Sequence, residues 1–298
     1  MTGDRPEVVD PAVDRPVRRV GPAGGRDDTD RVVGEEPLEI RVGGRPLAVM
    51  MRTPGDDLDL AAGFLVTEGL VPGPEAIARL RHCAAAAEGP APGGDEANAV
   101  SATLTPGVEV PEERWKRAIA ASSACGLCGK VAIEDVLLRA PPVTSDTRVA
   151  GAVLRALPAR LRAAQPLFGE TGGLHAAALF ALDGALRLLR EDVGRHNAVD
   201  KVVGHYVRAG AWPPADSVLL VSGRAGFEIV QKAQVARLPV VAALGAPTSL
   251  AVDLAVSGGL TLVAFLREGG FNVYAHPERV TEVSGPGRCS STAPSPTP

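Results

Sequence analysis

Residues 217–266 read SVLLVSGRAGFEIVQKAQVARLPVVAALGAPTSLAVDLAVSGGLTLVAFL. Short apolar runs alternate here with longer segments: strands are predicted over residues 217–221, 239–244 and 260–266, and helices over 227–236 and 249–256. Glycine, proline and polar residues separate these elements. Strands that alternate with helices are typical of a largely parallel sheet covered by helices, so this stretch predicts an α/β domain.

The same alternation continues on the N-terminal side of this stretch. A helix is predicted over residues 149–164, followed by strands over 174–182 and 185–193 that meet at the tight turn Asp183-Gly184. Asn197 then precedes a helix that it can cap. A short strand over 273–275 ends the pattern. Because strands joined by a tight turn are antiparallel, we expect the central sheet to be mixed.

A smaller unit is predicted ahead of this domain. In chain order it contains a β-hairpin over residues 38–51 that turns at Gly43-Gly44, a helix from Asp56 or Asp57 to about Gly69, a short helix over 75–80 and a strand over 99–105. These elements predict an α+β subdomain.

The chain is therefore expected to divide into five parts. They are a disordered arm over residues 1–34, the α+β subdomain over 35–110, a helical linker over 111–145, the α/β domain over 146–283 and a disordered tail over 284–298. Disorder is assigned to both ends because they lack apolar periodicity and are rich in Pro, Gly and polar residues.

The composition excludes several classes of protein. With 298 residues, 45% of them hydrophobic, the chain can form one large domain or two ordinary ones. A net charge of −4 gives no overall attraction to nucleic acid or to anionic membranes. No apolar run is long enough to span a bilayer. Four cysteines in a chain of this length do not indicate a secreted disulfide scaffold, and we expect a cytoplasmic protein with reduced thiols.

Two of the four cysteines lie in the segment SSACGLCGK, residues 122–130. Apolar residues at helical spacing follow the segment, which places Cys128 near a predicted helix N-terminus and Cys125 in the loop before it. The positive end of the helix dipole and the charge of Lys130 both favour a thiolate, which is the reactive form of cysteine. The preferred interpretation is a reactive thiol pair on a loop.

Other interpretations of the pair remain open. A structural zinc site would need two further Cys or His ligands, and the candidates are Cys83, Cys289 and five scattered histidines. No second Cys-x-x-Cys motif or close His pair completes such a site, so we expect no metal. A thioredoxin-type redox pair would normally lie near the start of a βαβ unit, and a purely structural pair does not suit the glycine-rich flanks.

Four turns follow the predicted strands of the α/β domain, over residues 194–197, 222–226, 245–249 and 267–272. Ligands of such sheets bind beyond the carboxyl ends of the strands. Backbone N–H groups at helix starts, together with Arg195, Arg224 and Arg267, suit phosphates, although each turn alone could be an ordinary connection. His196 and His175 could act there as an acid or base or as ligand contacts, or they could be structural.

Several nearby polar residues need no functional role. We expect His205 to be structural, and Gln231 and Lys232 to lie on the exposed surface of their helix. Asp192 and Asp200 either orient the basic residues or are solvated charges.

The motifs together resemble the formate dehydrogenase accessory sulfurtransferases, the FdhD family. The resemblance rests on the Cys-x-x-Cys loop and on residues 35–38 (EEPL), 171–175 (TGGLH), 191–201 (EDVGRHNAVDK), 222–224 (SGR) and 265–274. It covers residues 35–280 and leaves out both ends of the chain.

The resemblance implies a fold and site residues. The fold would be a three-layer, cytidine-deaminase-like domain with a mixed central sheet, but Arg195-His196-Asn197 offers no general-base glutamate and Ser222-Gly223-Arg224 no cysteine pair, so deaminase chemistry is not expected. Cys125 would carry a persulfide, with Cys128 assisting. The residues expected to bind the client cofactor are His175, Arg195, His196, Ser222, Gly223, Arg224, Phe265, Leu266, Arg267, Glu268, Gly269, Gly270, Asn272 and Tyr274.

The resemblance also implies a reaction and partners. The protein would take sulfur from a cysteine desulfurase and transfer it to the molybdenum bis(pterin guanine dinucleotide) cofactor of formate dehydrogenase. Guanine nucleotides such as GDP or GMP would mimic that cofactor, and a homodimer is expected. Two further hypotheses stay open: a cofactor-binding chaperone of formate dehydrogenase without thiol chemistry, and a zinc-stabilised nucleotide-binding protein.

Overall fold

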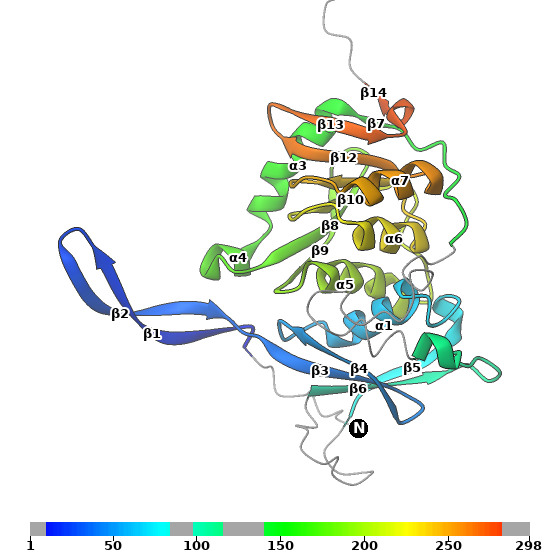
Figure 1. Ribbon diagram of the computed structural model, residues 1–298, viewed down its shortest axis with the longest axis horizontal. Helices are drawn as coiled ribbons and strands as arrows, with labels where there is room; N and C mark the ends of the chain where they lie inside the picture. The colour runs from blue at the N-terminus through cyan, green and yellow to red at the C-terminus, as the bar shows by residue number, and fades with distance from the viewer. Residues whose placement is uncertain (1–9, 84–97, 116–139, 282–298) are drawn as a thin grey trace, which may run out of the picture.

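The larger domain is built on a six-stranded sheet (Figure 1). The structure is a computed structural model that describes residues 10–83, 98–115 and 140–281. In spatial order the strands are β13 (Gly270–Ala275), β12 (Thr261–Arg267), β11 (Val240–Ala243), β10 (Ser217–Val221), β8 (His175–Ala181) and β9 (Leu186–Asp192). Strands β10, β11 and β12 are parallel, whereas β8 is antiparallel to β10 and to β9, and β13 is antiparallel to β12.

Helices cover both faces of this sheet. On one side lie α5 (Arg195–Arg208), α6 (Phe227–Val235) and α7 (Ser249–Gly258), and on the other lies α3 (Gly151–Ala163), with the short α4 (Pro166–Thr171) beyond it. The mixed α/β architecture predicted from the sequence is therefore confirmed. The closer likeness to cytidine deaminases stays a prediction.

Alternation along the strands divides the core into two parts. In β10, Leu219 and Val221 pack with the α5–α7 side, while Val218 and Leu220 pack with α3, and all four side chains are buried. Because helices cover both faces of the sheet, both sets of alternating side chains are apolar. The central strands therefore appear in the sequence as continuous apolar runs. Small strands β7 (Val149–Ala150) and β14 (Val280–Thr281) pair in parallel beside α3, and the 3-10 turn η4 (Pro277–Arg279) precedes β14.

The N-terminal subdomain is a four-stranded sheet that packs on one helix. The strand order is β4 (Arg45–Arg52), β3 (Glu36–Val42), β6 (Ala99–Leu104) and β5 (Ile77–His82), and the helix is α1 (Asp57–Thr67). The predicted short helix over residues 75–80 is wrong: a 3-10 turn η1 (Pro74–Ala76) leads into β5, which pairs with β6. Backbone pairing overrides the helix propensity of the Ala, Arg and Leu side chains in this segment. The helix predicted from Pro111 begins there, and its continuation lies outside the described residues.

An antiparallel ribbon projects from the body of the molecule (Figure 1). Its strands are β1 (Ala12–Gly21) and β2 (Gly24–Val33), so the prediction of a disordered arm was wrong for this part of the chain. Oppositely charged side chains meet across the two strands: Arg18 is 2.9 Å from Asp27 and Arg19 is 2.8 Å from Asp30. A composition that suggested disorder is therefore compatible with a ribbon in which most opposite charges meet across the two strands.

The two parts of the molecule meet where helices α1 and α5 cross. Each helix presents a glycine at the crossing, Gly63 on α1 and Gly204 on α5. A Cβ atom on Gly204 would lie 1.7 Å from the carbonyl oxygen of Asp59, and one on Gly63 would lie 1.9 Å from that of Asp200. Only glycine allows the two backbones to approach this closely.

A buried charge cluster lies beside this crossing. Lys232 of α6 donates hydrogen bonds to the Asp200 carboxylate at 2.9 Å, to Glu68 at 2.8 Å and to Thr67 at 2.9 Å. Gln231 and Lys232 are both buried, so their predicted place on the surface was wrong. Burial alone would lower the pKa of Lys232, but the neighbouring Asp200 and Glu68 carboxylates raise it, so the ammonium form persists inside the protein.

Replacing Lys232 by methionine is expected to lower the free energy of unfolding by about 3 kcal/mol or more, because Asp200 would stay buried without its cation. Urea unfolding of the purified variant measures this loss. The matched control is Arg237→Lys, which keeps an exposed cation after the end of the same helix and is expected to be close to neutral. Equal stability of the Lys232→Met variant and the unmodified protein would contradict the role given to this ion pair.

No helix within the described residues is long and apolar enough to cross a membrane. The same residues contain no group of three or more His, Cys, Asp or Glu side chains placed to hold a metal ion.

Candidate functional site

Most of the predicted ligand-binding residues gather at one edge of the six-stranded sheet. Strands β9 to β12 end at this edge, and α5, α6 and α7 start there. We call it the carboxyl edge and define it by His175 and residues 194–197, 222–226, 245–249 and 265–272. Three helix N-termini therefore point their free N–H groups toward the same region, an arrangement that favours anionic ligands.

His175 and Arg195 meet around the turn after β10. A Cβ atom on Gly223 would lie 3.5 Å from His175 Nδ1 and 3.9 Å from Arg195 Cδ, so the side chains of both residues line this glycine. Ser222 extends the pairing of β10 with β8: its Oγ accepts a hydrogen bond from the backbone N–H of Ala176 at 2.9 Å. The structure thus brings together four of the residues that the sequence placed in the site.

The environment of His175 favours the neutral form of its imidazole. Partial burial lowers the pKa of its imidazole below the ordinary value, and the nearby charges of Arg195 and His196 lower it further, against a smaller opposite effect of Asp192. A neutral imidazole next to a guanidinium can accept a hydrogen bond or a proton from a ligand at neutral pH.

Glu228 joins this group, although the sequence analysis did not single it out. Its carboxylate oxygen lies 2.9 Å from His196 Nε2, which is buried and makes no well-aligned hydrogen bond. His196 and Glu228 occupy the first turns of α5 and α6, so their meeting joins the starts of two helices. An acidic residue in the first turn of a helix that follows a Gly-rich strand end was the available signal.

Backbone hydrogen bonds connect the turns of the carboxyl edge in series. Gly245 N–H donates to Gly223 O at 2.9 Å, and Phe265 N–H donates to Gly245 O at 3.1 Å. A Cβ atom on Gly245 would lie 2.7 Å from Gly223 O and 2.9 Å from Arg224 Cα, which explains the need for glycine at this position. The turns after β10 and β11 and the last residues of β12 are therefore joined in one continuous surface.

The end of β12 presents an aromatic side chain at the carboxyl edge. Phe265 adopts a left-handed backbone conformation with φ of 52°, at a break in the pairing of β12 with β13, and 44% of it is exposed. Leu266, in contrast, is buried against the α3 side, so it supports the site and does not face a ligand. Arg267 Nη1 donates to the carbonyl oxygen of Leu244 at 2.6 Å, which holds this side chain against the edge.

The hairpin between β12 and β13 carries the other predicted residues. Glu268 and Gly269 form its exposed tip, and Gly270 starts β13 with φ of 157°. Asn272 donates to the Tyr274 hydroxyl at 3.3 Å, so these two side chains share one face of β13. Tyr274 packs against the part of the core that includes α7. Arg224 is exposed in the middle of the edge.

Cys125 and Cys128 lie outside the described residues, but the ends of their segment are placed. On one side, Trp115 Nε1 donates to the carbonyl oxygen of Pro46 in the N-terminal subdomain at 3.2 Å. On the other side, Gln234 Nε2 at the end of α6 donates to Ala140 O at 3.0 Å. Since α6 starts at the carboxyl edge, its last turn holds the returning chain at the opposite edge of the sheet.

A model of the FdhD/NarQ family matches residues 33–281, which include the cysteine pair and the whole carboxyl edge. The chain belongs to the FdhD/NarQ family. Sulfur carrier proteins FdhD from Streptomyces avermitilis and Mycobacterium tuberculosis are 51% and 49% identical to this chain. The first alignment covers 88% of this chain and 92% of the relative, and the second covers 83% and 90%.

The fold is also similar to that of a solved structure. The crystal structure of a candidate formate dehydrogenase accessory protein from Desulfotalea psychrophila superposes with a TM-score of 0.72 at 25% identity. The superposition covers 91% of this chain and all of the other. Family membership, which the sequence motifs suggested, is therefore confirmed.

Proposed function

We propose that this protein is a sulfur carrier that serves formate dehydrogenase. The observation that carries the proposal is the identity of about half of all aligned residues with proteins named sulfur carrier protein FdhD, over most of both chains. The similar fold of a formate dehydrogenase accessory protein supports the choice of client. A cysteine desulfurase is the proposed sulfur donor, and the molybdenum bis(pterin guanine dinucleotide) cofactor is the proposed acceptor.

Cys125 is the proposed carrier. Its thiolate attacks the terminal sulfur of the donor's persulfide, a new S–S bond forms on Cys125, and the donor cysteine leaves as a thiolate. Electrons balance, because one S–S bond replaces another and no external oxidant is needed. The acceptor then attacks the terminal sulfur and supplies the electron pair of the new bond, the S–S bond breaks, and Cys125 leaves as the thiolate. Cys128 has a proposed assisting role, in which it receives the sulfur or resolves a mixed disulfide.

The carboxyl edge is the proposed site for the acceptor. The starts of α5, α6 and α7, together with the exposed Arg224, suit the pyrophosphate groups of a guanine dinucleotide. The exposed ring of Phe265 offers a face on which a guanine can stack. Neutral His175 and the polar groups of Asn272 add hydrogen-bonding partners for the base or the pterin.

The chain is long enough to bring the thiols to this site. Helix α6 separates the anchored end of the cysteine segment from the carboxyl edge by a rise of roughly 14 Å. Cys128 precedes the anchored Ala140 by twelve residues, which span about 40 Å when extended. The chain that carries the cysteines is therefore long enough to span the length of α6 and reach the carboxyl edge.

Expression of this chain in a bacterium that lacks its own sulfur carrier tests the proposal. Formate dehydrogenase activity should return, and an empty vector should leave it absent. A chaperone without thiol chemistry is the alternative, and it predicts the same recovery with a Cys125→Ala/Cys128→Ala double variant. No recovery with the unmodified chain, despite soluble expression, would contradict both.

GDP is expected to bind at the carboxyl edge, and Arg224→Ala should weaken this binding about tenfold through loss of one charge-assisted hydrogen bond to phosphate. Isothermal titration calorimetry measures the change. Arg79→Ala is the matched control, because it removes an exposed arginine from β5 of the N-terminal subdomain. Equal GDP affinity of the Arg224 and Arg79 variants would exclude Arg224 from the site.

A further inference from the structure

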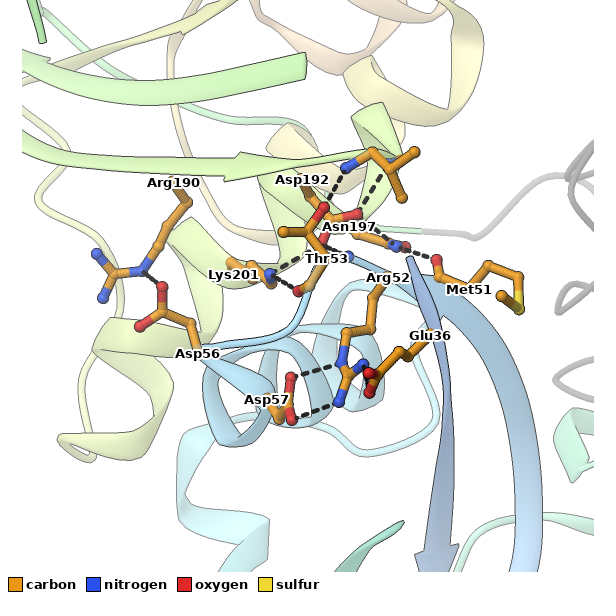
Figure 2. Close-up of polar contacts among 12 residues, drawn as sticks. Glu36, Met51, Arg52, Thr53, Asp56, Asp57, Arg190, Asp192, Asn197 and Lys201 are labelled. Atoms are coloured by element: carbon orange, nitrogen blue, oxygen red, sulfur yellow. Dashed lines mark hydrogen bonds and ion pairs between the residues drawn. The ribbon is translucent and has the colours of Figure 1, made fainter. Parts of the chain in front are cut away.

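The carboxylate of Asp192 joins the two subdomains at the start of α5 (Figure 2). One oxygen accepts hydrogen bonds from Gly194 N–H at 2.8 Å and from Asn197 Nδ2 at 2.9 Å. The other accepts from Thr53 N–H at 3.2 Å and lies 2.8 Å from Lys201 Nζ. Asp192 is fully buried, so this carboxylate is neither a solvated charge nor a direct ligand contact.

Thr53, in the loop between β4 and α1, makes the reciprocal contacts. Its hydroxyl accepts a hydrogen bond from Val193 N–H at 3.1 Å, and its carbonyl oxygen accepts one from Lys201 Nζ at 2.9 Å. Asn197 adds a bond to the carbonyl oxygen of Met51 at 2.8 Å (Figure 2). The backbone of residues 193–194 is therefore held from both sides, by Asp192 within the α/β domain and by Thr53 from the N-terminal subdomain.

The held turn is the one that presents Arg195 and His196 at the carboxyl edge. We propose that Thr53 and Asp192 are positioning residues, through which the N-terminal subdomain sets the orientation of Arg195 and His196 toward the ligand. This inference deepens the proposed function and rests on the carboxyl edge being the ligand site. It assigns the N-terminal subdomain a part in ligand binding, although none of its own described side chains lies among the predicted contact residues.

A second polar cluster in the same interface provides a comparison. Thr67 Oγ1 donates to Asp200 at 2.6 Å and accepts from Lys232 at 2.9 Å. Both threonines are buried and both connect the N-terminal subdomain to α5. Asp200, however, lies in the second turn of α5, away from the turn that carries Arg195. Loss of the Thr67 hydroxyl should therefore weaken the interface without moving the carboxyl edge.

The experiment compares Thr53→Val with Thr67→Val in the full-length protein. Both changes remove one buried hydroxyl and keep the side-chain shape. The first readout is the NMR titration of His175 without ligand, which is assignable because the chain has five histidines. Since the charge of Arg195 contributes to the lowered pKa of His175, displacement of the turn should bring that pKa back toward the ordinary value of histidine. The second readout is GDP affinity.

Thr53→Val is expected to move the titration of His175 and to weaken GDP binding about tenfold, whereas Thr67→Val should change neither. Thr53→Ser, which restores the hydroxyl, should restore both values. Asn197→Ala, at a half-exposed position, should have the same effects as Thr53→Val and replaces that variant in the experiment if Thr53→Val does not fold.

An unchanged His175 titration in both Thr53→Val and Asn197→Ala, or an equal change in Thr67→Val, would overturn the proposal. Absence of GDP binding by the unmodified protein would instead count against the proposed ligand site, and the His175 titration would still decide the positioning role.

Discussion

Cys125→Ala is expected to abolish the activation of formate dehydrogenase while leaving the fold and GDP binding intact. The reason is chemical: without the Cys125 sulfur the proposed persulfide has no atom on which to form. Formate dehydrogenase activity should fall to the level of cells that lack any sulfur carrier. The measurement is that enzyme's activity in a strain deleted for its own carrier and complemented with the variant.

Two controls separate this effect from loss of protein. Cys83→Ala removes the thiol that directly follows β5 and is expected to keep normal activation. Cys128→Ala is expected to reduce activation without abolishing it, because Cys128 has the assisting role. Normal activation by Cys125→Ala would exclude Cys125 as carrier, and normal activation by the double cysteine variant would favour the chaperone.

Gly204→Ala is expected to lower the free energy of unfolding by about 4 kcal/mol or more. The added Cβ would lie 1.7 Å from Asp59 O and 2.6 Å from the backbone nitrogen of Gly63. Backbone atoms of a packed helix cannot move aside as a flexible side chain can, so α1 and α5 must separate. Separation also breaks the polar contacts between the subdomains. Urea unfolding measures the loss, or the variant is recovered only as aggregate.

Gly169→Ala provides the matched control. Gly169 lies in α4, and a Cβ atom there meets nothing within 4 Å. Because alanine has the higher helix propensity, this variant should be neutral or slightly more stable. If Gly204→Ala were as stable as Gly169→Ala, the close crossing of α1 and α5 would not be a requirement of the fold.

The strands and helices of the α/β domain were predictable because local signals agree with tertiary structure there. Residues 218–221 are apolar, Ser222 and Gly223 follow them, and the strand has the predicted bounds, 217–221. The ribbon of β1 and β2 was not predictable from composition. Composition counts arginines and aspartates but does not say which residues lie opposite each other across the strands. Strand β5 was missed for a related reason: only pairing with β6 distinguishes it from a helix.

The residue types of the site could be predicted from the sequence, but the directions in which their side chains point could not. The motif over residues 191–201 suggested a single functional block. In the structure it divides: Arg195 and His196 are among the predicted contact residues of the carboxyl edge, while the side chains of Asp192, Asn197 and Lys201 contact the N-terminal subdomain. That division depends on the packing of α5 against α1, which no spacing within the motif reveals. Gly63 and Gly204 were a usable signal, because glycine inside a helix needs a packing reason.

The most direct test of the sulfur-carrier function is peptide mass spectrometry after incubation with a cysteine desulfurase and cysteine, without reductant. We expect one added sulfur atom on the peptide that contains Cys125, removable by reductant and absent from Cys125→Ala. Sulfur on Cys128 alone would reverse the roles of the two thiols. No added sulfur on either cysteine, with an active desulfurase in the same reaction, would contradict the sulfur-carrier function.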